Sequence, residues 1–338
     1  MAVTNGTHGH FKANPSLVVT ADHQIRMEEA PIHEPGPGEV LLHIKVTGIC
    51  GSDVHFWKHG RIGDLTIDGD CILGHEPAGV VLKKGADVTH LEPGVPCGHC
   101  FLCTGGRPNL CQDVAFAGVY PYHGTIQRYK VHPAKFAHRL PDNVTFDSAA
   151  LLEPLSVAMH ALRITPITMG TPVAVFGAGP IGLLTMASAA KVRDLFERKG
   201  WESSAGRTEY DMPNVVLECT GIESSIATAA FTVRRGGSIN VVGVSSRPSI
   251  NNIPFMHMSL AEIQLRFINR YHDTWPAALR ALEGGLIDPT KVDGLVTHRF
   301  KLEDAIDAMN LVAGITKPAP GERVVKVQIV DELEVEIP

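Results

Sequence analysis

One short segment restricts the fold of this chain more than any other. The apolar run Pro172-Val173-Ala174-Val175-Phe176 passes directly into Gly177-x-Gly179-x-x-Gly182, and residues 183–191 then show a helical pattern. A strand, a glycine-rich turn and a helix in this order bring backbone amides and a helix N-terminus together, where a pyrophosphate can bind. The alternative is a turn that only packs the helix on the strand. Apolar runs at 215–217 and 239–242 flank a helical pattern at 226–234, which favours a parallel sheet.

The first half of the chain has a different pattern. Up to about residue 165 it is rich in Gly, Pro, Val and His, and alternating runs such as 40–46 are typical of strands joined by turns. Helical patterns return at 275–282 and 302–309, and residues 325–329 alternate as a half-buried strand with Lys326 and Gln328 at the polar positions. A length of 338 residues suggests two domains.

Composition excludes several classes of protein. The net charge is −6 and there is no basic stripe, so neither nucleic acid nor an anionic membrane is expected as a partner. No run reaches the roughly 18 apolar residues that a membrane-spanning helix needs. The N-terminus lacks the charged and apolar regions of a secretory signal, so we expect a cytoplasmic protein and treat the sequons at Asn5 and Asn143 as chance.

Four of the seven cysteines lie close together. Cys97, Cys100, Cys103 and Cys111 fall within fifteen residues, and four thiolates can close a tetrahedral zinc shell with no open position. In a reducing cytoplasm this spacing favours metal over disulfides. An iron–sulfur cluster is the second competitor, although the long last gap disfavours it. The segment therefore predicts a structural zinc site.

A second possible metal site is dispersed along the chain. Cys50, the pair His75-Glu76 and Glu153 offer one soft donor and several harder ones, which is a donor set that can leave zinc an open position. Taken singly, each residue also has an ordinary explanation, as a small buried side chain, a hydrogen-bonded core histidine or a helix-start carboxylate. Cys71 and Cys219 are interpreted as core cysteines.

In this order, the motifs resemble those of the zinc-dependent medium-chain dehydrogenases, and within them the polyol branch that acts on sorbitol, xylitol, L-arabinitol or galactitol. The absence of a cysteine between Cys111 and Cys219 fits that branch, which has an oxygen donor where alcohol dehydrogenases have a cysteine. The similar stretches are Gly48-Ile49-Cys50-Gly51-Ser52-Asp53-Val54-His55-Phe56-Trp57, Leu73-Gly74-His75-Glu76, Leu151-Leu152-Glu153-Pro154-Leu155-Ser156-Val157, Glu218-Cys219-Thr220-Gly221, Arg270-Tyr271-x-x-Thr274-Trp275-Pro276 and Leu295-Val296-Thr297-His298-Arg299-Phe300.

The resemblance implies an α/β fold with two domains. A β-rich GroES-like catalytic domain would comprise residues 1–165 and 297–338 and carry the zinc lobe at 95–113. A Rossmann domain with a doubly wound parallel sheet would occupy residues 166–296. The implied activity is the reversible, NAD-linked oxidation of a sugar alcohol to the ketose by hydride transfer, in a cytoplasmic homotetramer with two zinc ions per chain.

The resemblance also assigns roles to single residues. Cys50, His75 and Glu76 would hold the catalytic zinc, with Glu153 as fourth ligand or as partner of the water on that zinc; Ser52 and His55 would relay the proton. Substrate would contact Phe56, Glu153, Arg270 and Tyr271, with Phe56 standing where polyol relatives often have tyrosine. Contacts to the cofactor are expected from Gly177, Gly179, Pro180, Ile181, Gly182, Gly243, Val244 and Arg270.

Two stretches are shorter than this pattern. Around residues 91–97 a strand that usually begins Asp-Arg-Val is missing before the zinc lobe. Residues 183–214 number 32, enough for one crossover of about 30 residues, so strand 1 of the sheet order 3-2-1-4-5-6 is expected to run straight to strand 4. Strands 2 and 3 would then be absent, together with the acidic residue that holds the cofactor ribose. Glu197 has the right spacing for this residue but lies in a helical pattern, so no ribose ligand is assigned. The alternative function is that of an inactive or regulatory chain that keeps zinc.

Overall fold

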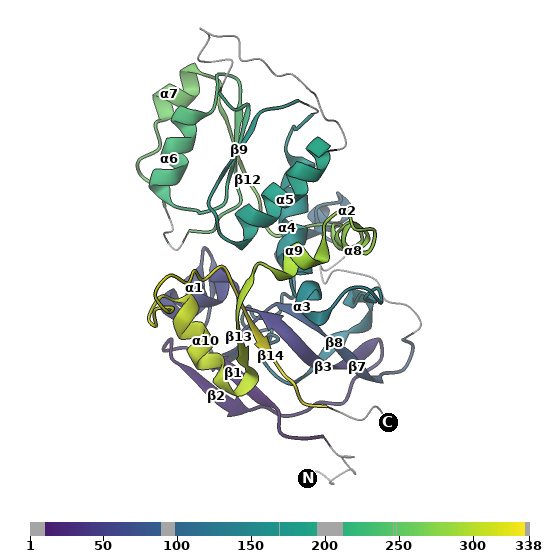
Figure 1. Cartoon of the computed structure of the whole chain (residues 1–338). Coiled ribbons are helices and arrows are strands. Elements are labelled where there is room, and N and C mark those ends of the chain that lie inside the picture. The colour runs from purple at the N-terminus through teal and green to yellow at the C-terminus, as the bar shows by residue number, and fades with distance from the viewer. Residues whose placement is uncertain are drawn as a thin grey trace.

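The computed structural model describes residues 11–88, 99–168, 170–194, 212–245, 247 and 249–334, without the side chains of 190–194. It has two parts (Figure 1). In one, helices cover both faces of a parallel sheet; in the other, short helices lie against strands that are mostly antiparallel. None of the described helices combines the length and the apolar character needed to cross a membrane.

The mostly antiparallel part is built around the long strand β3 (Glu39–Gly48). Its alternating sequence buries most of its residues, and β3 pairs with β7, β8 and β14. A separate three-stranded sheet has the order β2-β1-β6. The elements of this part up to residue 164 are β1 (Pro15–Val19), β2 (Ile25–Glu29), α1 (Gly51–His59), β4 (Arg61–Ile62), β5 (Leu65–Thr66), β6 (Cys71–Ile72), β7 (Glu76–Lys84), α2 (Phe101–Thr104), β8 (Tyr129–Pro133), α3 (Phe146–Ala149) and α4 (Leu152–Ile164).

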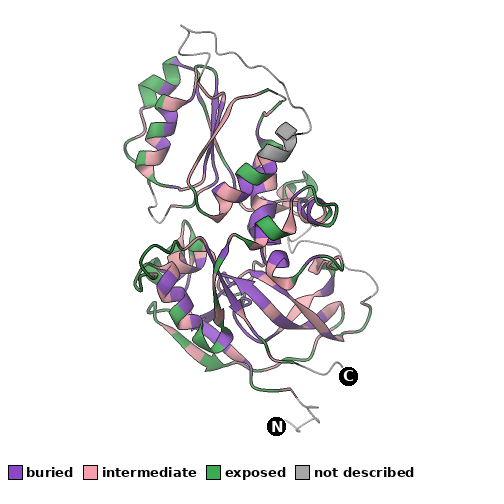
Figure 2. Cartoon of the chain, viewed as in Figure 1, coloured by how far each residue is buried: buried purple, intermediate pink, exposed green. Residues whose placement is uncertain are grey.

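The end of the chain returns to this part of the fold. Strand β14 (Lys326–Val330) lies between β3 and β13 (Val296–Lys301), and α10 (Ala305–Val312) packs beside them. The sequence predicts a half-buried β14, and this is wrong, because both faces of the strand are covered. Lys326 is only 2% exposed and Gln328 is fully buried, so the polar positions of this strand face the protein interior. In Figure 2 the strands of this sheet are largely coloured as buried.

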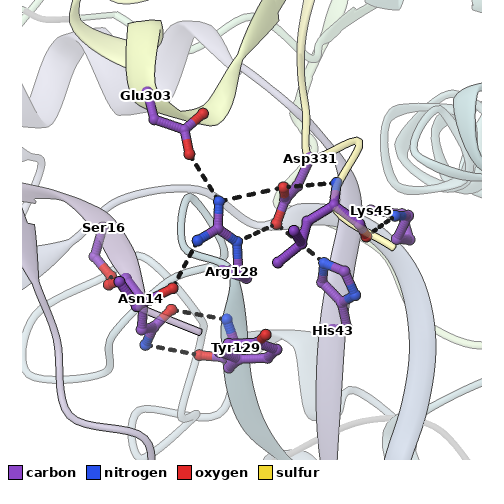
Figure 3. Close-up of polar contacts among 10 residues, drawn as sticks. Asn14, Ser16, His43, Lys45, Arg128, Tyr129, Glu303 and Asp331 are labelled. Carbon is purple, nitrogen blue, oxygen red and sulfur yellow. Dashed lines mark hydrogen bonds and ion pairs between the residues drawn. The ribbon is translucent and has the colours of Figure 1, made fainter. Parts of the chain in front are cut away.

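A buried ion-pair network fixes the residue that follows β14 (Figure 3). Asp331 accepts a hydrogen bond of 2.6 Å from Arg128 Nε and lies 3.0 Å from His43 Nε2. Arg128 also pairs with Glu303 at 2.7 Å, and all of these partners except Glu303 are at least nine-tenths buried. Burial opposes ionisation of Asp331, but the hydrogen bonds from His43 and Arg128 lower its pKa to about 2.

We expect Asp331→Ala to lower the free energy of unfolding by about 3 kcal/mol, because it removes the buried carboxylate partner of Arg128 and leaves only the exposed Glu303. Urea unfolding measures this loss. The matched control is Arg26→Ala, since Arg26 pairs with Glu28 and Asp70 on the surface with 44% of its side chain exposed, and such pairs contribute less than about 1 kcal/mol. Equal losses in the two variants would contradict a stabilising role for the network.

The same network predicts a pH dependence. The pKa of Asp331 is lower in the folded chain than the value of about 3.9 in an unfolded one. Its contribution to stability is therefore complete above about pH 4 and is lost as the pH falls towards 2. Asp331→Asn should flatten this part of the curve of unfolding free energy against pH, and an unaltered curve would refute the assignment.

The other part contains the parallel sheet that the alternating pattern predicts, and this prediction is confirmed. Its strands β9 (Val173–Phe176), β10 (Val215–Glu218), β11 (Ser238–Val241) and β12 (Gln264–Phe267) pair in parallel, in the order β12-β11-β10-β9. In Figure 1, α6 and α7 cover one face and α5 the other. The helices of this part and of the segment that follows it are α5 (Pro180–Asp194), α6 (Glu223–Thr232), α7 (Phe255–Leu260), α8 (Trp275–Glu283) and α9 (Pro289–Asp293).

Strand β9 lies at one end of this strand order. Among the described residues its pairing partner is β10, and all four of its residues are only half buried, whereas β10 and β11 are fully buried. In the sheet order 3-2-1-4-5-6, loss of strands 2 and 3 would leave strand 1 at the end of the sheet beside strand 4. Residues 195–211, which include Glu197, and residues 89–98 before the cysteine cluster lie outside the described residues. The absence of two strands from the sheet, and of one before the zinc lobe, therefore stays a prediction.

Candidate metal and cofactor site

Three of the predicted metal ligands converge although they lie on different elements. Cys50 precedes α1, His75 precedes β7, and Glu76 is the first residue of β7. One donor atom from each lies within 4.8 Å of the other two. A thiol, an imidazole and a carboxylate at this spacing form a donor set that suits zinc and leaves room for a further ligand. The residues present therefore fit the metal that the sequence predicts.

Asp53 orients two of these ligands. It is fully buried, accepts a hydrogen bond of 2.9 Å from the Cys50 backbone N–H, and lies 3.4 Å from His75 Nδ1. Despite burial, the facing His75 keeps the pKa of Asp53 below its usual range, and Asp53 in turn raises the pKa of His75. With Nδ1 facing Asp53, Nε2 is the ring atom available to a metal. Sequence reasoning missed this role, although Asp53 at the third position of α1 is a capping signal.

Glu76 has a buried cationic partner. Its carboxylate pairs with Lys326 on β14, whose ammonium also donates a hydrogen bond of 3.0 Å to the Ile49 carbonyl. Both side chains are at most 2% exposed. Although burial opposes it, the carboxylate of Glu76 raises the pKa of Lys326. In the zinc-free chain the Lys326 ammonium therefore compensates the negative charge of Glu76.

We expect Lys326→Met to lower the free energy of unfolding of the zinc-free chain by about 3 kcal/mol, because it leaves a buried carboxylate uncompensated. Added zinc should then raise the melting temperature more in the variant than in the parent chain, since the metal supplies the missing positive charge. Thermal unfolding before and after zinc addition measures both effects. Lys291→Met, which alters an exposed lysine on α9, is the control. Equal zinc-induced increments in parent and Lys326→Met would contradict the coupling.

Glu153 lies near this group but is not part of it. It is 4% exposed in the first turn of α4, and its carboxylate does not join the three donors that lie within 4.8 Å of one another. Burial raises its pKa to about 7, with His75, Lys326 and Arg270 opposing the shift and Glu76 adding to it. This position suits a group that contacts a molecule bound at the metal better than it suits a direct ligand.

The proposed proton-relay and substrate residues differ in how close they lie to the metal ligands. Ser52 Oγ lies 3.5 Å from His75 Nε2. The His55 ring stacks on His59, and burial together with the charge of His59 lowers the pKa of His55. Phe56 is 2% exposed in the hydrophobic core beside α10, so its contact with substrate stays a prediction.

Arg270 and Tyr271 follow β12. The Arg270 guanidinium lies 4.0 Å from the centre of the Phe116 ring, and its charge interacts with Glu153. The centres of the Tyr271 and Trp275 rings lie 6.1 Å apart, and burial raises the pKa of the Tyr271 hydroxyl. Both residues thus border the site from the part of the chain that carries the parallel sheet.

The described members of the cysteine cluster also come together. Cys100 Sγ lies 3.4 Å from Cys103 Sγ and 3.9 Å from Cys111 Sγ, and the three sulfur atoms lie within 4.8 Å of one another. No disulfide joins any two of the described cysteines. Cys97 lies outside the described residues. Three converging thiols fit the predicted structural zinc.

The glycine motif forms the turn between β9 and α5, as expected. Gly177 has a positive φ of 104°, and a side chain on Gly182 would lie 1.9 Å from the Gly177 carbonyl oxygen. Gly179 is different, because a side chain there would meet nothing within 4 Å. Pro180 and Ile181 begin α5, so the N-terminus of this helix faces the open side of Gly179.

The neighbouring strand ends complete this edge of the sheet. Glu218, fully buried at the end of β10, accepts hydrogen bonds of 2.9 Å from the backbone N–H groups of Thr220 and Gly221. A side chain on Gly243 would lie 2.0 Å from Gly221 N, and Val244 beside it is 47% exposed. The carboxyl ends of parallel strands are where such sheets bind ligands. Sequence reasoning assigned no role to Glu218, because its burial depends on tertiary packing.

Comparison with known proteins shows what this chain is similar to. Residues 36–142 match the alcohol dehydrogenase GroES-like domain. The chain is 38% identical to sorbitol dehydrogenase from Gallus gallus over 331 aligned positions, which cover 87% of this chain and 92% of that enzyme. It is 38% identical to L-arabinitol 4-dehydrogenase from Aspergillus oryzae over 378 aligned positions, which cover 96% of each chain. Because 378 positions exceed the 338 residues of this chain, that enzyme has residues with no counterpart here.

A solved structure gives the same result for the fold. An alcohol dehydrogenase from Escherichia coli CFT073, determined in complex with NADH, superimposes with a TM-score of 0.77 at 26% identity. The superposition covers 94% of this chain and all of that one. The fold seen here thus extends over the full length of a related nicotinamide-binding structure.

Proposed function

The chain belongs to the zinc-dependent medium-chain polyol dehydrogenase family, and we propose that it oxidises a sugar alcohol reversibly to the ketose with NAD as hydride acceptor. The observation that carries this proposal is the convergence of Cys50, His75 and Glu76 beside Arg270 and Tyr271. Sorbitol, xylitol, L-arabinitol and galactitol are the candidate substrates. Zinc and a nicotinamide dinucleotide are its cofactors, with Cys50, His75 and Glu76 as the ligands of the catalytic zinc.

The protein groups around the donors prepare the site for a hydroxyl group. Zinc, when bound, lowers the pKa of a coordinated hydroxyl and so makes its proton easier to remove. Asp53 holds the His75 ring in the orientation that presents Nε2. Lys326 keeps a positive charge beside Glu76. Glu153, as fourth ligand or as partner of a hydroxyl or water there, is suited to hydrogen bonding because its pKa lies near neutrality.

The proton leaves through side chains of α1. Ser52 lies beside His75, and His55, half buried one helical turn further along α1, has a lowered pKa and is neutral at pH 7. A hydroxyl followed by a neutral imidazole can pass a proton towards the surface. Substrate hydroxyls contact Arg270 and Tyr271, and the substrate also contacts Phe56.

The dinucleotide lies at the carboxyl ends of β9, β10 and β11. The pyrophosphate approaches Gly179 at the N-terminus of α5, where the exposed backbone leaves room for it. Pro180, Ile181, Gly182, Gly243, Val244 and Arg270 border the same edge. In this proposal the sheet lacks the strands that would hold the adenosine, so binding depends more on the pyrophosphate and nicotinamide ends. The longer aligned enzyme from Aspergillus oryzae supports such a shortening.

The remaining assignments extend the proposal to the whole chain. The catalytic domain comprises residues 1–165 and 297–338, and the cofactor domain residues 166–296. Cys97 joins Cys100, Cys103 and Cys111 around a second, structural zinc in the lobe at 95–113. The protein works as a homotetramer in the cytoplasm, where the thiols stay reduced.

The decisive experiment is a fluorescence titration of the zinc-loaded chain with NADH. We expect saturable binding in the micromolar range, followed by NAD reduction with at least one of the four sugar alcohols. Lack of binding by a folded chain with two zinc ions would overturn the catalytic proposal. The alternative, an inactive or regulatory member that keeps zinc, would then stand, because the zinc ligands are complete while the cofactor domain is short.

A further inference from the structure

A large cavity lies against strands of the GroES-like part and is also lined by His75, Arg270 and Tyr271. Its volume is about 620 Å³. Five consecutive residues of β7, from Pro77 to Val81, line it, so the cavity borders an edge of this strand and not only one face. Alternate residues of β3 and β8 line the cavity as well. Within the described residues β3 lies between β7 and β8 and pairs with both, and β7 is at the end of the strand order, so its outer edge is available to the cavity.

The wall of this cavity is mainly apolar. Leu42, Val81, Phe136, Leu140 and Phe146 contribute aliphatic and aromatic surface along its length. Ligand pockets in proteins typically have volumes of about 300–1,000 Å³ and combine such a lining with a few placed polar groups. A polyol needs a hydrogen-bond partner for nearly every carbon, which this wall does not supply. The cavity is therefore suited to a molecule with an apolar body.

Several charged groups that line the cavity are already matched. Arg270 stacks on Phe116 and interacts with Glu153, and His272 lies 3.0 Å from Asp273. Arg270 and His272 therefore already have acidic partners and give no unmatched positive charge to a further ligand.

A further lining residue, Lys130, carries a positive charge that is not matched in this way. Lys130 on β8 donates a hydrogen bond of 2.6 Å to the His123 carbonyl, and in the described part of the chain it forms no ion pair. Burial lowers its pKa to about 8, as expected for an ammonium without an anionic partner. The neighbouring His132 has a pKa of about 4 through burial and is neutral at pH 7. Lys130 thus supplies unmatched positive charge to the cavity, and the exposed Arg139 also lines it.

We propose that this cavity binds one molecule of an amphipathic carboxylate, with its apolar body along Leu42, Val81 and Phe136 and its carboxylate against the Lys130 ammonium. An apolar body removes the wall of the cavity from water, and the carboxylate supplies the charge that Lys130 lacks. The proposed position lies in the same cavity as His75, Arg270 and Tyr271 but uses a different part of its lining, and its occupancy does not require turnover.

Calorimetric titration of the zinc-loaded chain with octanoate tests the proposal. We expect one octanoate per chain and at least about tenfold weaker binding of octan-1-ol, which has the same apolar body without the charge. Sorbitol should not displace octanoate. Several weak sites, equal affinity for acid and alcohol, or displacement by sorbitol would each overturn the proposal. This comparison needs no variant.

Two variants and a control locate the site. Lys130→Met should weaken octanoate binding about tenfold and leave octan-1-ol within about twofold, because it removes the charge and keeps an apolar stem. Val81→Trp should weaken both ligands by filling the cavity. Lys84→Met, an exposed lysine at the end of β7 that does not line the cavity, should change neither. Octanoate affinity unchanged in Lys130→Met would refute the placement of the carboxylate.

Discussion

Cys50→Ala should reduce polyol-dependent NAD reduction at least about a thousandfold while leaving the fold intact. Cys50 supplies the thiol of the three-donor group with His75 and Glu76, and two donors without it cannot hold zinc in a defined geometry. Zinc content should fall from two ions to one per chain, because the cluster of Cys100, Cys103 and Cys111 lies on other elements. Metal analysis alongside steady-state kinetics measures both changes.

The matched control for this variant is Cys71→Ala. Cys71 is fully buried on β6, belongs to neither thiol-containing donor group, and burial raises the pKa of its thiol to about 12. It should keep both zinc ions and most of the activity, with a small loss of stability from the cavity left behind. Full turnover in Cys50→Ala, or loss of both zinc ions, would show that the catalytic site has been assigned to the wrong residues.

Gly179→Val should weaken NADH binding by at least about tenfold with an unchanged melting temperature. A Cβ atom at Gly179 would meet no atom within 4 Å outside the adjoining backbone, so we expect the fold to accommodate the valine. It would nevertheless occupy the space at the N-terminus of α5 through which a pyrophosphate approaches the backbone. Fluorescence titration with NADH and thermal unfolding of the same preparations separate the two effects.

Gly182→Ala is the complementary variant, because it should act on the fold first. Its methyl group would lie 1.9 Å from the Gly177 carbonyl oxygen, so the turn or the helix must shift and the melting temperature should fall. If Gly179→Val binds NADH as tightly as the parent chain, the dinucleotide does not approach this turn. The glycine motif would then serve only to pack α5 on β9, which is the alternative that the sequence left open.

Much of the fold followed from local patterns. The apolar runs of β9, β10 and β11 and the helical patterns of α5, α6, α8 and α10 lie where periodicity predicts them, because side-chain spacing along a strand or helix is a property of the segment itself. The burial of Lys326 and Gln328 did not follow. Alternation predicts a solvated face, but β14 lies between β3 and β13 and is covered on both sides.

For the site, the sequence by itself determined the donor types and the glycine turn, since Cys50, His75, Glu76 and Gly177 stand in motifs whose residue types dictate their chemistry. Only the tertiary structure decided how they are supported. Lys326 reaches the carbonyl of Ile49 across 277 residues, Asp53 contacts both Cys50 and His75, and Lys130 faces a cavity bounded by three strands. These contacts depend on which strands pair and on how burial shifts each charge, and neither is encoded in the spacing of residues along one segment.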